Sequence, residues 1–286
     1  MDSTQYSTTF LNCGRNALRY IIRAFSIKEL NLPYYTCPSV WQAAKKENCK
    51  INFYHIDKNF LPTKEFKKDD FILYTNYFGT SANNVLALAD KYKNIIIDNS
   101  QAFFMPPAGI ASFNSARKFF LVPDGSFVFS KKTLSESFMF DMSYLELEEH
   151  YGEISATNYD IYRNRNFDLD IDIRQASDKA TNSILNIKME DEQKSRLEKF
   201  KILNKNLSKY NQLKFNLSEY DVPFIYPFIP INDNVKLSID KSKFETFWSP
   251  QNEETTEGFF QRNLIPIPID FRFSHNYLKN ITILDD

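Results

Sequence analysis

The feature that most constrains the fold is a regular exchange of strand-like and helix-like runs over the first 130 residues. The pattern predicts strands at residues 30–35, 51–56, 70–77, 94–98 and 125–130. Apolar residues at helical spacing predict helices at residues 14–25, 39–47 and 83–93. Strands that alternate with helices indicate an α/β fold, with a mostly parallel sheet covered by helices on both faces. Ligands of such sheets lie at the carboxyl ends of the strands.

In the second half of the chain the alternation of strand-like and helix-like runs ends. Residues 176–213 are polar and helix-like, with one apolar face. Two extended segments punctuated by proline follow at residues 222–231 and 264–273, and proline confines such segments to edge strands or strand ends. We therefore expect a large α/β domain over residues 1–150 and a smaller α+β lobe over residues 151–286.

Composition excludes several classes of function. A net charge of -1 argues against a protein that binds nucleic acid through bulk positive charge. With six glycines the chain has no glycine-rich dinucleotide or P-loop motif. No run approaches the roughly 18 apolar residues of a membrane-spanning helix, and the first residues do not resemble a signal peptide. Three cysteines without CxxC spacing and three scattered histidines predict no metal site and a cytoplasmic protein with reduced thiols.

A glycine stands where the first predicted helix begins. In residues 12–18 (NCGRNAL), Gly14 opens that helix, so its N–H groups and dipole form a candidate anion site. Arg15 adds a planar fork of charged donors. The alternative is a plain glycine turn that binds nothing.

An aspartate follows the most apolar predicted strand. Residues 95–97 are all isoleucine, and they bring Asp98 to the end of a buried strand, where a carboxylate needs a cationic or donor partner. Alternatively Asp98 caps a helix, with Gln101 three residues later completing a capping box.

Lys118 lies among aromatic residues in the segment 112–125 (SFNSARKFFLVPDG). Desolvation there favours the neutral, nucleophilic form of its amine. The alternative is a surface Arg-Lys pair whose stems lie over phenylalanine. A further segment, residues 75–79 (TNYFG), follows a predicted strand and either places an aromatic or amide in a cleft or forms only a turn.

Taken together, the order of helix-start anion site, aspartate and lysine is that of a fold-type I enzyme that uses pyridoxal 5'-phosphate (PLP). That cofactor needs a site for its phosphate, an aspartate at its pyridine nitrogen and a lysine to form the Schiff base. The chain resembles the DegT/DnrJ/StrS family of sugar aminotransferases. The segments that carry the resemblance are residues 14–18, 32–40, 76–103, 115–129 and 264–281.

The resemblance implies a role for each candidate residue. Asp98 would pair with the pyridine nitrogen, Gln101 would approach the ring hydroxyl, and Lys118 would bind the cofactor covalently. The remaining candidates for cofactor binding are Gly14, Arg15, Asn16, Ser115, Tyr77 and Arg174.

Several positions depart from the family pattern. Arg15 stands where the family has a hydroxyl residue, and Phe113 stands where it has a phosphate-binding serine, for which Ser115 or Ser112 would substitute. Position 37, where some members place an aromatic over the ring, is a cysteine, and Tyr34, Tyr35 or Tyr77 would compensate. Asp98 and Lys118 are only 20 positions apart, a shorter spacing than in typical members.

The family layout also implies a homodimer with the active site near the interface. The segment 172–177 resembles the stretch through which a partner chain reaches the cofactor phosphate, so Arg174 is the residue expected to do so. The alternative is that Arg174 is a surface arginine in an acidic stretch.

These observations predict a PLP-dependent aminotransferase of the cytoplasm. The resemblance implies a nucleotide-linked keto sugar as substrate, glutamate as amino donor, and a role in the synthesis of surface polysaccharide or antibiotic sugars. One alternative is another PLP-dependent reaction on a sugar nucleotide, although the known dehydratases of this fold replace the lysine by histidine. A second alternative is a degenerate member that keeps the fold and dimer for a binding or structural role.

Overall fold

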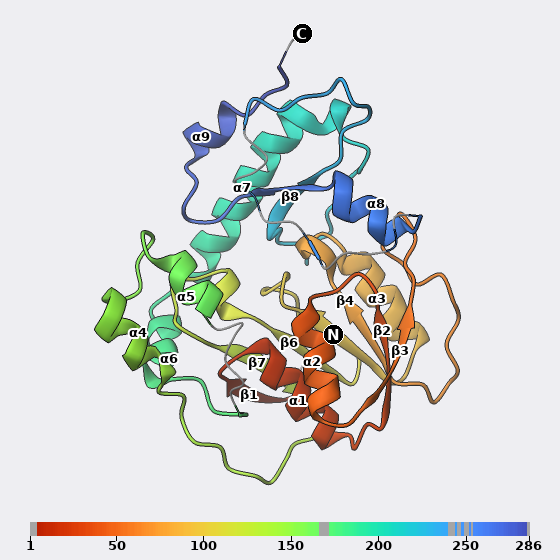
Figure 1. The fold of residues 1–286 in the computed structure, drawn as a ribbon, viewed down its shortest axis with the longest axis vertical. Coiled ribbons are helices and arrows are strands. Elements are labelled where there is room, and N and C mark those ends of the chain that lie inside the picture. The colour runs from red at the N-terminus through yellow and green to blue at the C-terminus, as the bar shows by residue number, and fades with distance from the viewer. Residues whose placement is uncertain are drawn as a thin grey trace.

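A seven-stranded sheet forms the centre of the computed structural model, which describes residues 5–165, 172–239, 244, 247–248, 252 and 254–284 (Figure 1). Its order is β1-β7-β6-β5-β4-β2-β3. The strands are β1 (Ser7–Leu11), β2 (Glu29–Pro33), β3 (Lys50–Tyr54), β4 (Ile72–Thr75), β5 (Ile95–Asn99), β6 (Ala111–Asn114) and β7 (Ser126–Ser130). Strands β3, β2, β4, β5 and β6 run parallel, and β7 is antiparallel to both β6 and β1. The predicted mostly parallel sheet is confirmed.

Helices cover both faces of this sheet. In β5 the side chains of Ile95 and Ile97 pack into one apolar core and that of Ile96 packs into another, because successive strand residues point to opposite faces. Helices α1 (Gly14–Ala24) and α2 (Pro38–Lys46) contribute to the core of Ile96, and α3 (Ala82–Lys91) contributes to the other. The three layers expected from the sequence are therefore present.

The first helix shows why the sequence pattern was informative. Ala17, Leu18, Ile21 and Ile22 recur at helical spacing, and all four are buried on the side facing the sheet. Helix α2 begins with Pro38 at its first position, where the missing N–H has no helical partner to lose.

The second half of the chain adds six helices and a small sheet within the described residues. The helices are α4 (Ser143–Tyr151), α5 (Tyr159–Arg165), α6 (Asp178–Leu185), α7 (Met189–Leu207), α8 (Thr256–Asn263) and α9 (His275–Lys279). The two proline-punctuated segments contain β8 (Ile225–Phe228) and β9 (Ile265–Pro268), which pair antiparallel. With α7 and α9 they enclose a third apolar core and form the upper lobe in Figure 1. The division of the chain at residue 150 stays a prediction.

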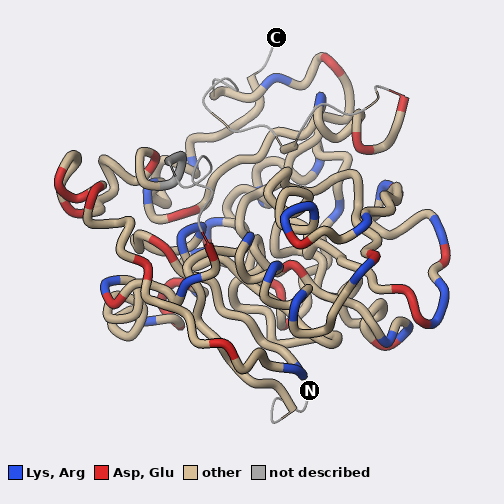
Figure 2. The backbone as a smooth tube through the Cα atoms, turned by 60° about the horizontal axis from the view of Figure 1, so that its bottom comes forward, with Lys and Arg blue, Asp and Glu red and all other residues tan. Residues whose placement is uncertain are grey.

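The two lobes are joined by apolar contact. Phe224, Ile225, Phe260 and Leu264 from the second half belong to the same core as α3 and β5. Figure 2 shows Lys and Arg interspersed with Asp and Glu along the chain, in keeping with the net charge of -1. Of the helices in the described ranges, none is long and apolar enough to cross a membrane.

Candidate functional site

A cavity lies where β4, β5 and β6 end and α1 begins. Six of the residues proposed from the sequence line it, namely Gly14, Arg15, Asp98, Gln101, Ser115 and Lys118. Nine further residues complete the lining, namely Cys13, Cys37, Ser39, Val40, Thr75, Ser100, Phe113, Arg117 and Trp248. The carboxyl ends of parallel strands meet here, as expected for a ligand site in an open α/β sheet.

Asp98 is delivered to the cavity by β5, and only 4% of it is exposed. Its Oδ1 accepts a hydrogen bond from the backbone N–H of Ser100 at 2.8 Å. Burial raises the pKa of this carboxyl, while the charge of Lys118 and the hydrogen bonds from Ser100 lower it. In the described chain the next element after β5 is β6, so the alternative that Asp98 caps a helix is wrong.

Lys118 ends a 3₁₀ turn (Ala116–Lys118) that directly follows β6. The side chain is half-buried, and its Nζ lies 5.9 Å from the centre of the Phe224 ring. An ammonium over an aromatic face is attracted by the ring quadrupole. Lys118 is therefore a cavity residue close enough to influence the ionisation of Asp98, and not part of an exposed surface pair.

Gln101 offers an unused donor to the cavity. Its Oε1 accepts from the backbone N–H of Phe78 at 2.9 Å, which fixes the orientation of the amide. Its Nε2 is buried and has no hydrogen-bond partner among the described residues. A buried donor without a partner is costly unless a ligand satisfies it. The amide thus suits an acceptor group of a bound molecule.

The cavity is lined by more cationic than anionic side chains. Arg15, Arg117 and Lys118 line it, against Asp98 as the one carboxyl among the lining residues. A Cβ added to Gly14 would lie 3.4 Å from Ser100 Oγ, so the first turn of α1 packs closely against the loop after β5. Fixed cations beside a helix N-terminus favour a bound anion such as a phosphate group.

Three predicted residues are not brought to the cavity within one chain. Asn16 donates to the Asn12 side chain at 3.0 Å on the inner side of α1. Tyr77 is fully buried and donates its hydroxyl to the backbone oxygen of Tyr35 at 2.9 Å. Arg174 accepts a backbone hydrogen bond from Asn12 at 3.0 Å and does not line the cavity.

Trp248 is the lining residue that sequence reasoning missed most completely. It comes from the segment ahead of α8, and its ring lies 4.8 Å from that of Tyr35 in an edge-on arrangement. Together with Phe113 it supplies the aromatic lining. Arg117 was also missed, although it directly precedes Lys118 in the segment that drew attention.

A second, larger cavity lies in the upper lobe between the β8–β9 sheet and α8. Its lining includes Gln212, Asp233, Phe259 and Arg262. None of the residues proposed from the sequence is among its lining residues. Within the described ranges, no group of three or more His, Cys, Asp or Glu side chains is placed to hold a metal ion.

The sequence matches no family model and no curated relative. Solved structures with a similar fold include a DegT DnrJ EryC1 StrS aminotransferase from Brucella abortus, with 12% identity over 95% of this chain and 83% of that chain, at a TM-score of 0.59. The sugar aminotransferase CalS13 from Micromonospora echinospora has 12% identity over 96% of this chain and 85% of that chain, at a TM-score of 0.59. An aminotransferase from Psychrobacter cryohalolentis has 12% identity over 96% of this chain and 84% of that chain, at a TM-score of 0.61. The chain therefore has the fold of these aminotransferases, as its sequence resemblance implies.

Proposed function

We propose that this protein is a PLP-dependent aminotransferase that acts on a keto sugar. The observation that carries the proposal is a single cavity in which a buried carboxyl, an unused amide donor, a lysine and a cationic helix start meet. When bound, PLP supplies an electron sink and an aldehyde that exchanges amino groups. Each polar part of that molecule has a matching side chain here.

Asp98 matches the pyridine nitrogen. Its carboxylate is buried, so it gains from a cationic partner that replaces lost water. Placed against the nitrogen, the carboxylate holds a proton there. Gln101 Nε2 matches the ring hydroxyl, which would accept its unused hydrogen bond. The pair fixes one edge of the ring.

The cationic side matches the phosphate. Arg15, from the first turn of α1, lines the cavity together with Ser115 and Arg117 from the segment after β6. Their donors replace the family hydroxyl and serine that this sequence lacks. The ring would then lie near Trp248 and Phe113, the aromatic lining residues.

Lys118 matches the aldehyde carbon. Its side chain is half-buried and lines the same cavity as Asp98, close enough for its charge to lower the pKa of that carboxyl. The same amine would hold the aldehyde of the cofactor and, when not so engaged, would be placed to take a proton from the carbon of the amino donor and to return one to the product. Removing Lys118 therefore removes both covalent binding and proton transfer.

We further propose that the substrate is a nucleotide-linked keto sugar and that glutamate is the amino donor. The sugar class is supported by the fold shared with sugar aminotransferases. A nucleotide-linked keto sugar and glutamate are supported by the sequence resemblance. The three cysteines of the protein are free thiols, which suits the reducing cytoplasm. The aminated product would serve the synthesis of polysaccharide or antibiotic sugars.

We also propose that the active unit is a homodimer. Large apolar side chains are exposed, with Met139 76%, Phe140 55% and Leu185 78% exposed. Gln175, the neighbour of Arg174, donates its backbone N–H to Met139 at 2.9 Å. Arg174 thus lies in a segment bordered by apolar surface, which a second copy would cover. Sedimentation at micromolar concentration should give a dimer, and a monomer with bound PLP would contradict it.

The reaction is tested by its first half. PLP-loaded protein mixed with glutamate should release 2-oxoglutarate in amounts equal to the bound cofactor, and a nucleotide-linked keto sugar should then return the cofactor to its starting spectrum. Bound PLP without release of 2-oxoglutarate from glutamate, or of the keto acid from any other amino donor, would refute an aminotransferase and favour the degenerate member.

A further inference from the structure

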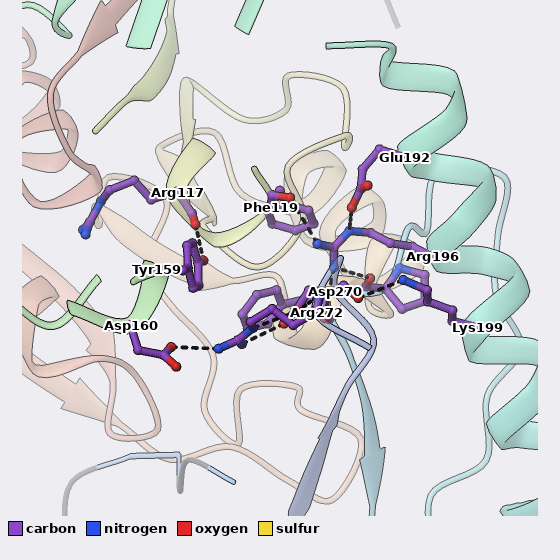
Figure 3. Close-up of polar contacts among 11 residues, drawn as sticks. Arg117, Phe119, Tyr159, Asp160, Glu192, Arg196, Lys199, Asp270 and Arg272 are labelled. Carbon is purple, nitrogen blue, oxygen red and sulfur yellow. Dashed lines mark hydrogen bonds and ion pairs between the residues drawn. The ribbon is translucent and has the colours of Figure 1, made fainter. Parts of the chain in front are cut away.

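The residues on either side of Lys118, Arg117 and Phe119, each have their backbone oxygen bound by a side chain from the second half of the chain. The hydroxyl of Tyr159 donates to the backbone oxygen of Arg117. The guanidinium of Arg196 donates through Nη2 to the backbone oxygen of Phe119 at 3.4 Å. Figure 3 shows these two contacts from α5 and α7 on the turn that carries Lys118. The backbone is thereby hydrogen-bonded to the second half of the chain on both sides of the lysine.

Arg196 is buried and contacts the segment around Lys118 through hydrogen bonds and ring packing. The residue is 0% exposed, and its Nε pairs with Glu192 at 2.7 Å. Its Nη1 donates to the backbone oxygen of Phe224 at 3.2 Å, and its guanidinium lies 4.4 Å from the centre of the Phe119 ring. Phe224 is also the residue whose ring lies against Lys118 Nζ. A buried arginine is tolerated only when its donors are used. Glu192 of the same helix uses Nε, while Nη1 and Nη2 donate to Phe224 and Phe119, which lie around Lys118.

Tyr159 belongs to the same connected set. Its ring is covered by the guanidinium of Arg272 at 5.0 Å. Arg272 pairs with Asp270 at 2.9 Å and with Asp160 at 2.7 Å. Lys199 of α7 donates to the backbone oxygen of Asp270 at 2.8 Å. Figure 3 shows these charged side chains side by side between α5, α7 and the end of β9.

The backbone of the turn is held mainly at Ala116, whose N–H donates to the Gly125 oxygen at 2.9 Å and whose oxygen accepts from Phe119 and Phe120 at 3.0 and 2.9 Å. The bond of Lys118 itself, from its N–H to the Ser115 oxygen, is longer, at 3.3 Å, and a single 3₁₀ turn is a weak element. We propose that Arg196 and Tyr159 are positioning residues that hold this turn so that the Lys118 amine faces the cavity. Its relevance to catalysis rests on the proposed function, but the placement is a property of the chain without cofactor.

The placement is measurable through the chemical reactivity of the amine. The full chain without cofactor is treated with a trace of acetic anhydride at a series of pH values, and the acetylation of each lysine is quantified by mass spectrometry. The exposed Lys45 and Lys93 serve as internal standards. Tyr159→Phe and Arg196→Met should raise the labelling of Lys118 relative to these standards about fivefold or more and alter its pH profile, because the amine loses its fixed place.

A matched control separates positioning from general loosening. Tyr162 lies on the same helix as Tyr159, is 1% exposed, and donates its hydroxyl to the backbone oxygen of Gly152 at 2.6 Å, away from the Lys118 turn. Tyr162→Phe should leave the labelling of Lys118 at the wild-type level. Wild-type labelling in Tyr159→Phe, or an equal rise in Tyr162→Phe, overturns the proposal. If Arg196→Met does not fold, Tyr159→Phe decides the outcome alone.

Cofactor binding is measured separately, on the wild-type protein, by borohydride reduction in the presence of PLP. If no PLP is captured while labelling changes as expected, the proposed function fails and the positioning role stands. If PLP is captured but labelling of Lys118 is unchanged in Tyr159→Phe, the positioning role fails alone. Where both succeed, Tyr159→Phe should also slow covalent capture of PLP about tenfold at an unchanged melting temperature.

Discussion

Replacing Asp124 by asparagine should stabilise the protein at neutral and alkaline pH but much less in acid. Asp124 is 5% exposed, and its Oδ1 accepts from the backbone N–H of Ser177 at 2.9 Å. Its Oδ2 is buried without a hydrogen-bond partner among the described residues. Burial raises the pKa of this carboxyl to about 7, helped by the charge of Asp141 and opposed by the Ser177 hydrogen bonds and by Arg117.

The size of the effect follows from the two protonation equilibria. The folded protein keeps a proton on Asp124 up to about pH 7, whereas the unfolded chain loses it near the ordinary aspartate pKa of 3.8. Between these values the folded state binds the extra proton, so the free energy of unfolding falls as pH rises. The loss is at most about 1.4 kcal/mol per pH unit, which gives about 2–3 kcal/mol between pH 5 and pH 8. Asparagine does not ionise, so Asp124→Asn should escape this loss.

The assay is urea unfolding of both proteins from pH 5 to pH 8 at one fixed concentration, because the stability of a dimer depends on concentration. The advantage of Asp124→Asn should grow steadily up to about pH 7 and then level off. Asp69→Asn removes the same charge from an exposed site and should show no such growth. A stability difference that stays constant from pH 5 to pH 8 would refute the reasoning, since Asp124 would then be ionised in the folded state.

Two further substitutions, and a control for the second of them, test the cavity and its surroundings. Asp98→Asn should keep part of the PLP binding but slow the half-reaction with glutamate about 100- to 1000-fold, because an amide cannot hold a proton on the pyridine nitrogen; a rate equal to wild type, followed by release of 2-oxoglutarate, would exclude that role. Gly79→Ala should lower the free energy of unfolding by about 3 kcal/mol or more in urea, because the residue has φ +68° and the new Cβ would lie 2.5 Å from the Val222 oxygen and 2.7 Å from the Gln101 oxygen. Gly152→Ala, at φ +74° and ψ 179° with nothing within 4 Å of the new Cβ, has only backbone strain of about 1–3 kcal/mol and should cost less than Gly79→Ala; equal costs would show that the close contacts do not matter.

The parts of the fold that were predicted are those whose sequence repeats a short period. Ile95, Ile96 and Ile97 are each 0% exposed, and a fully buried strand is what such a run indicates. Strands β1 and β6 were not predicted. Strand β1 is a partly exposed edge strand with polar residues, and β6 combines polar residues with pairing to both β5 and β7, so neither shows the pattern by itself. Residues 176–213, expected to be helical, form α6 and α7 with a break between them.

The site divides in the same way. Gly14, Asp98, Gln101 and Lys118 could be proposed because each follows a recognisable local pattern, and all four line one cavity. Trp248 reaches that cavity only through tertiary folding, from a segment with no motif. The assignment of Gly14, Asp98, Gln101 and Lys118 to cofactor binding stays a prediction.

Arg196 illustrates the harder case. It lies in a stretch of mostly charged residues that indicates a solvated helix face, yet it is 0% exposed. Tyr159 lies in the stretch of residues 135–175, which is rich in Tyr, Asp, Glu and Asn and has only weak periodicity, so that its sequence predicts no helix there. Their contacts with the Lys118 turn join segments about 40 and 80 positions apart, which local patterns cannot reveal.

Whether Lys118 binds the cofactor is decided by mass spectrometry after borohydride reduction. The protein is mixed with an equimolar amount of PLP, reduced, digested and mapped, and its visible absorbance is recorded before and after reduction. The phosphopyridoxyl group should be found on the peptide that contains Lys118, with loss of the visible band on reduction. Lys118→Ala should give no such band while keeping the wild-type circular dichroism spectrum. A modified lysine elsewhere, or an unmodified wild-type protein, would contradict the assignment of this cavity to PLP.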